Sequence, residues 1–149
     1  MKEVVKKEIL YDLRETIKIL ERKDDKDIRQ LRILSNHAIE DVALHKDLDM
    51  ISITVMVYSL FKTIHCIKKE DYQRLINNLK MAEKSLNNNN FGSYNKNIRA
   101  IFRIIHSCSK EVRKHLQDVT QAARMKKGAV LLEKGLSIGQ AAGLMGLSN

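Results

Sequence analysis

Proline and tryptophan are absent from this sequence of 149 residues, and aromatic residues make up only 5% of it. Without proline, the chain lacks the residue that most effectively interrupts a helix. Glycine occurs once before residue 128 and five times from there on. Leu, Ile, Lys and Glu are plentiful instead. This composition predicts an all-α protein.

A hydrophobic run long enough to span a bilayer is also missing. The longest apolar run, Met50 to Phe61, contains serine and threonine and is shorter than the roughly 20 residues that a membrane-spanning helix needs. The sequence has two cysteines, Cys66 and Cys108, and shows no signal peptide. These features predict a cytoplasmic protein with free thiols and no membrane contact.

The motifs of metabolic enzymes are lacking as well. The sequence shows no glycine-rich phosphate loop, no paired-carboxylate motif and no arguable Ser-His-Asp order. His65, Cys66, His106 and Cys108 are side chains of the kinds that bind zinc. However, adjacent residues on a helix point about 100° apart, so His65 and Cys66 cannot easily share an ion. We expect no enzyme activity, no metal site and no cofactor.

Apolar residues at helical spacing predict five helices, over about residues 2–22, 26–46, 50–68, 71–86 and 94–127. The third is apolar nearly all round and is expected to be central, with Met56, Leu60 and Ile64 buried. The predicted architecture is an up-and-down helical bundle. Because the glycines gather near the end, we divide the chain into a bundle domain (1–120) and a C-terminal appendage (121–149).

Residues 135–149 form a helix-capping pattern. Ser137 and Gln140 have the spacing of a capping box. Gly146 lies where a short helix would stop, and Ser148 would cap a following helix. A cap, a short helix, a glycine turn and a second cap predict the first half of a helix-turn-helix.

The segment from Leu132 to Ser148 resembles the helix-turn-helix of small prokaryotic DNA-binding regulators, especially antitoxin-like proteins. The matching residues are Glu133, Lys134, Gly135, Ser137, Ile138, Gly139, Ala141, Ala142, Leu144, Gly146, Leu147 and Ser148. The resemblance implies DNA binding. In such motifs the second helix reads the bases, and here it would begin at Asn149. We therefore expect a truncated helix-turn-helix within these residues.

The net charge of +9 is concentrated beside this motif. Residues 95–134 contain ten basic and three acidic residues, whereas residues 1–94 have a net charge of only +2. Concentrated positive charge is what phosphate binding requires. The candidate DNA-binding residues are Arg124, Lys126, Lys127, Lys134, Ser137, Gln140, Ser148 and Asn149.

Two arginine–histidine pairs suggest an alternative function. Arg32 and His37, and Arg99 and His106, have spacings similar to those of HEPN-type ribonucleases, which are metal-independent. Arg103 lies closer to His106 and is a better-placed partner. Ile33 and Ala100 follow the arginines where that family usually has a polar residue. In the non-catalytic interpretation, these arginines lie on solvated helix faces.

We therefore expect a DNA-associated prokaryotic regulator, antitoxin-like or transcription-factor-like. Its helical domain would support homodimerisation or bind a protein partner, and its C-terminal part would contact the phosphate backbone of DNA. The alternatives are the HEPN-like RNA endonuclease and a non-catalytic helical protein-interaction domain.

Overall fold

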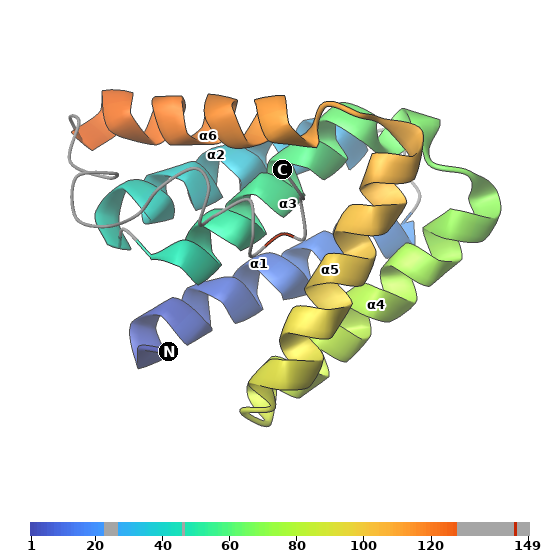
Figure 1. Cartoon of the computed structure of the whole chain (residues 1–149), viewed down its shortest axis with the longest axis horizontal. Helices are drawn as coiled ribbons and strands as arrows, with labels where there is room; N and C mark the ends of the chain where they lie inside the picture. The colour runs from blue at the N-terminus through green and yellow to red at the C-terminus, as the bar shows by residue number, and fades with distance from the viewer. Residues whose placement is uncertain (23–26, 46, 128–144, 146–149) are drawn as a thin grey trace.

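The computed structural model describes residues 1–22, 27–45, 47–127 and 145, and these contain no strand. The all-α prediction is confirmed (Figure 1). The helices, with one short 3-10 turn, η1, are α1 (Glu3–Arg22), α2 (Asp27–His45), α3 (Leu48–Thr63), η1 (Ile64–Cys66), α4 (Lys69–Asn87), α5 (Phe91–Cys108) and α6 (Val112–Lys127).

The core is built around α3. Eleven of its 16 residues are buried, and it packs against α1, α2, α5 and α6. Met56 and Leu60 are fully buried, as predicted. Ile64 is only partly buried, because α3 ends at Thr63 and Ile64 begins η1.

The other helices surround α3 in a connected series. α2 packs against α1 and α6, α1 also packs against α4, and α4 packs closely against α5. In Figure 1, α4 and α5 lie side by side and are steeply inclined to α2 and α6. The helices α1, α2, α5 and α6 therefore enclose α3, and α4 packs on the outer pair α1 and α5.

Buried threonines in α1 and α3 are satisfied within their own helices. The hydroxyl groups of Thr16, Thr54 and Thr63 donate to the carbonyl oxygens of Asp12, Met50 and Ser59, each at 2.7 Å. Hydrogen bonds to the preceding turn are the usual way for threonine to occupy a helix interior. These bonds leave no unpaired hydroxyl group on Thr54 and Thr63 within the buried part of α3.

The single long helix predicted over 94–127 is wrong, because the structure has two helices there. Ser109 adopts an extended conformation after α5, and its hydroxyl oxygen accepts a hydrogen bond from the Glu111 backbone N–H at 3.3 Å. Serine before a helix start competes with the backbone in this way. The break lets α6 pack on α2 and α3.

The prediction of two free thiols is also wrong. Cys66 in η1 and Cys108 at the end of α5 form a disulfide, with their Cα atoms 5.8 Å apart. This separation lies within the range that a disulfide spans. The bond closes a loop of 42 residues and joins the end of the central helix to the end of α5.

The proposed boundary at residue 120 falls inside α6, where Ala123 is buried in the core. Met145 is likewise buried in the hydrophobic core cluster. The division into two parts therefore stays a prediction, and the remaining residues of the predicted helix-turn-helix lie outside the described ones. Among the helices of the described residues, none is long and apolar enough to cross a membrane.

We expect Leu60→Ala to lower the free energy of unfolding by about 3 kcal/mol, because the substitution leaves a cavity in a close-packed core. Leu60 is fully buried on the central helix. Urea denaturation measures the change. Met81→Ala, at an exposed position of α4, serves as the control and should change the value little. Equal losses for both variants would mean that α3 is not central.

Candidate functional site

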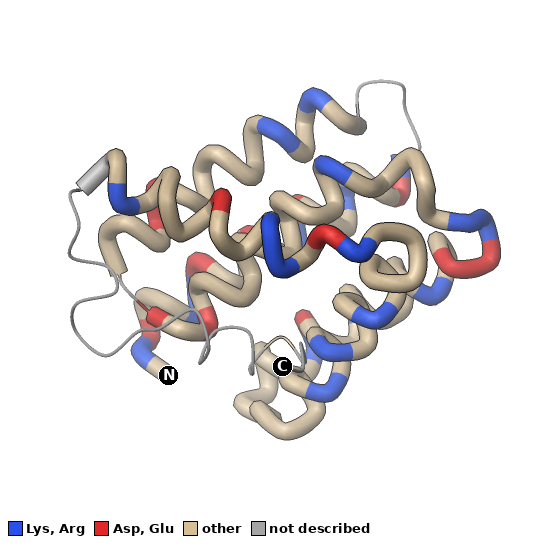
Figure 2. Tube along the Cα trace, turned by 45° about the horizontal axis from the view of Figure 1, so that its top comes forward, with Lys and Arg blue, Asp and Glu red and all other residues tan. Residues whose placement is uncertain are grey.

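The exposed face of α5 carries a basic stripe. Lys96, Arg99 and Arg103 are exposed at spacings of three and four residues, which place them on one side of a helix. The opposite side, including Ile98 and Phe102, is buried. α5 contains no acidic residue (Figure 2). We call Lys96, Arg99 and Arg103 the basic stripe.

Basic residues continue beyond the stripe. Lys110 follows α5, and Lys114 and Arg124 are exposed on α6. The ion pairs shown between described residues lie on α1, α2 and α4, and the residues of the basic stripe take part in none of these. The positive charge of the basic stripe is therefore not neutralised by those pairs.

Of the candidate DNA-binding residues, the structure places the side chain of Arg124 alone, exposed near the end of α6. Lys126 and Lys127 end α6, but their side chains are outside the description. Lys134, Ser137, Gln140, Ser148 and Asn149 lie outside the described residues. The charge count over residues 95–134 did not separate Lys96, Arg99 and Arg103 from the other basic residues, although their helical spacing was a usable signal.

The residues of the ribonuclease hypothesis lie on two helices. Arg32 and His37 are on α2, and Arg99, Arg103 and His106 are exposed on α5. The ring of His37 lies 5.2 Å from the ring of Tyr11, centroid to centroid. His37 also lines a groove of about 380 Å³ between α1 and α2, together with Tyr11 and Ile33.

A cluster of acidic residues with one histidine joins α1 to α2. Glu8 and Asp12 are one turn apart on α1, and His37 and Asp41 are one turn apart on α2. The His37 Nε2 atom lies 3.6 Å from the Glu8 Oε2 atom and 3.2 Å from the Asp41 Oδ2 atom. We call these four residues the α1–α2 cluster.

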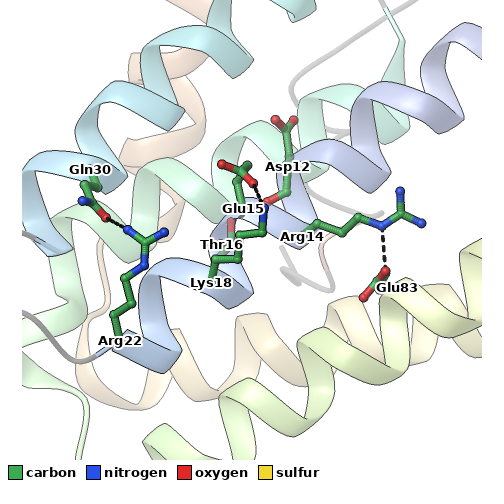
Figure 3. Close-up of polar contacts among 8 residues, drawn as sticks. All are labelled: Asp12, Arg14, Glu15, Thr16, Lys18, Arg22, Gln30 and Glu83. Atoms are coloured by element: carbon green, nitrogen blue, oxygen red, sulfur yellow. Dashed lines mark hydrogen bonds and ion pairs between the residues drawn. The ribbon is translucent and has the colours of Figure 1, made fainter.

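Asp12 is the most deeply buried member of the α1–α2 cluster. It is fully buried, and neither carboxyl oxygen has a hydrogen-bond partner. Burial, followed by the charges of Asp41 and Glu8, raises the pKa of Asp12 to about 8. In Figure 3, Asp12 points away from the side of α1 where Arg14 meets Glu83.

Asp41 has a similar electrostatic environment. Burial, followed by a hydrogen bond with Glu8, raises the pKa of Asp41 to about 6, against the opposing charge of His37. Its Oδ2 atom is within ion-pair distance of His37, yet it has no partner with hydrogen-bond geometry. We conclude that the contact with His37 is electrostatic and leaves this buried oxygen without a directional bond.

A second polar network joins α3 to α6, with Ser59 and His115 buried and Tyr58 and Asp118 partly buried. The Ser59 Oγ atom is 2.9 Å from His115 Nδ1, and the Tyr58 hydroxyl donates to Asp118 at 3.1 Å. Burial lowers the pKa of His115. Because Ser59 and His115 are both buried, this network stabilises packing and offers no accessible nucleophile.

No family model, curated protein or solved structure matches this chain.

Proposed function

We propose that this protein is a DNA-associated prokaryotic regulator that contacts phosphate groups through the basic stripe and exposed cations of α6. The observation that carries the proposal is the exposed, acid-free stripe of α5, formed by Lys96, Arg99 and Arg103. Lys96 and Arg103 are about 10 Å apart along the helix axis. Each backbone strand of DNA places a phosphate every 3.4 Å or so along its axis, so the stripe can reach more than one.

The resemblance of residues 132–148 to a helix-turn-helix supports the same proposal. Arg124, which lies between the basic stripe and that segment along the chain, is exposed on α6. We include a homodimer in the proposal, because prokaryotic DNA-binding motifs of this kind bind paired half-sites. Light scattering measures the oligomeric state. We also propose that the helical domain binds a protein partner.

We expect duplex DNA binding to weaken steeply with salt, because each neutralised phosphate releases counterions. Replacing Lys96, Arg99 and Arg103 with Glu should lower affinity by about tenfold or more and reduce the salt slope by about 3. Fluorescence anisotropy with labelled duplexes of unrelated sequence measures both quantities. The loss should be similar for every duplex, since phosphate contacts carry no sequence information.

The matched control replaces Lys7, Lys69 and Lys84 with Glu. These exposed lysines are spread over α1 and α4 and give the same change in net charge. We expect the control to retain most of the binding. If both variants lose affinity equally, the protein responds to net charge alone and the proposed interface is wrong.

The ribonuclease alternative gives a different result. Arg99 and His106 are two turns apart on α5, or about 10 Å along its axis. At this separation the two side chains do not easily bind the same phosphate group. Arg103 is closer to His106, but the HEPN-like spacing belongs to Arg99, and we expect no RNA cleavage in EDTA and no effect of His106→Ala. Cleavage of labelled RNA by the purified protein, lost in His106→Ala, would replace the regulator with the nuclease.

A further inference from the structure

The α1–α2 cluster has the spacing of a metal site. One atom each from Glu8, His37 and Asp41 lie within 4.8 Å of one another, and the two contacts of His37 Nε2 are 3.2 and 3.6 Å. Zinc binds nitrogen and oxygen ligands at about 2.1 Å, so neighbouring ligand atoms around one ion are about 3.4 Å apart. The two contacts of His37 are close to that separation, and the ligand atoms of Glu8 and Asp41 lie within 4.8 Å of each other.

Asp12 supplies a second and separate observation. It is not one of the three converging ligands, and it is fully buried with both carboxyl oxygens unpartnered. Asp41 and Glu8 are the charges that act on its carboxyl group. Buried polar atoms without partners are rare and costly. A cation beside Asp41 would stabilise this carboxyl group.

We propose that Glu8, His37 and Asp41 bind a divalent transition-metal ion. The single imidazole among carboxylates favours Zn²⁺ or Mn²⁺ over Mg²⁺ and Ca²⁺, which prefer oxygen ligands alone. Of these two ions, Zn²⁺ should bind more tightly, as the general order of metal affinities predicts.

The site is open to ions from solution. The side chain of His37 is 44% exposed, and His37 lines the groove between α1 and α2. Asp41 is much less exposed, and Glu8 is intermediate. An ion could therefore enter past His37 and would keep positions for water on the groove side.

Binding would connect the two helices directly, since Glu8 comes from α1 and the other two ligands from α2. An ion that binds the folded state alone stabilises it. The proposed DNA contacts are on α5 and α6, whereas the metal ligands are on α1 and α2. An experiment can therefore contradict the metal proposal without contradicting the DNA proposal, and the reverse.

Isothermal titration calorimetry on the full chain tests the proposal, after chelator treatment and removal of the chelator. We expect one Zn²⁺ per chain, weaker Mn²⁺ binding, no comparable Mg²⁺ binding and a higher Tm with Zn²⁺. Since even residues behind the ligands contribute about 10–100-fold, His37→Gln and Glu8→Gln should each weaken Zn²⁺ binding about 100-fold or more.

His106→Gln on α5 is the matched control, because His106 is also an exposed histidine, and it should leave Zn²⁺ affinity unchanged. His37 is exposed enough that its replacement should preserve the fold, which circular dichroism in EDTA checks. The absorption spectrum of bound Co²⁺ is a second readout, and His37→Gln should change it. The proposal is overturned if Zn²⁺ does not bind, or if His37→Gln and Glu8→Gln bind it as tightly as the unchanged chain.

Discussion

Between about pH 5 and pH 8, the free energy of unfolding of the Asp12→Asn variant is expected to fall by about 4 kcal/mol less than that of the unchanged chain. Burial and the charges of Asp41 and Glu8 raise the pKa of Asp12 from 3.8 to about 8. Over this range the folded state keeps a proton that the unfolded chain has released. The free energy of unfolding therefore falls as pH rises. Asparagine cannot ionise, so the variant loses this part of the fall.

Urea denaturation in EDTA at several pH values measures the effect, expressed as variant minus unchanged chain at each pH. Using this difference removes the constant cost of burying an amide. Asp71→Asn is the matched control, because Asp71 forms a surface ion pair with Arg74 on α4 and such pairs contribute little. A flat difference between pH 5 and pH 8 for Asp12→Asn would show that its carboxyl group is solvated.

Removal of the Cys66–Cys108 disulfide should lower the free energy of unfolding by about 4 kcal/mol. The bond closes a loop of 42 residues, and a cross-link of this span restricts the unfolded chain by about that amount. Cys66→Ser, Cys108→Ser and reduction with dithiothreitol should produce similar losses, measured by thermal or urea denaturation.

The double variant provides the control for this prediction. If the two cysteines are bonded, Cys66→Ser with Cys108→Ser should cost no more than either single change, because each alone already breaks the bond. A thiol assay on the unfolded, unreduced chain should find no free thiol. Additive losses with two reactive thiols would contradict the disulfide.

The central position of α3 could be predicted because its apolar residues lie on every side. Met56 and Leu60 belong to a run with no polar face to expose, so only the interior could hold it. The break between α5 and α6 was harder to predict. Ile105, Val112 and Leu116 keep the apolar stripe across it, whereas the signal for the break is the single hydroxyl of Ser109.

The α1–α2 cluster was missed for a different physical reason. Each helix carries a recognisable pair, Glu8 with Asp12 and His37 with Asp41, spaced four residues apart. However, the sequence does not say which faces of two helices meet. The pairing of Cys66 with Cys108 depends in the same way on where η1 and α5 come together. Helical periodicity predicts which residues share a face of one helix, whereas the packing of the helices decides which faces lie next to each other.

The interruption at Ser109 also sets the dimensions of the molecule. An unbroken helix from Phe91 to Lys127 would be about 55 Å long, nearly twice the width of a small domain. Its second half would extend into solvent with Leu116 and Val119 uncovered. As two segments, each is shorter than about 30 Å, and both residues are buried. The change of direction over three residues therefore lets α6 pack on α2 and α3 instead of extending away from them.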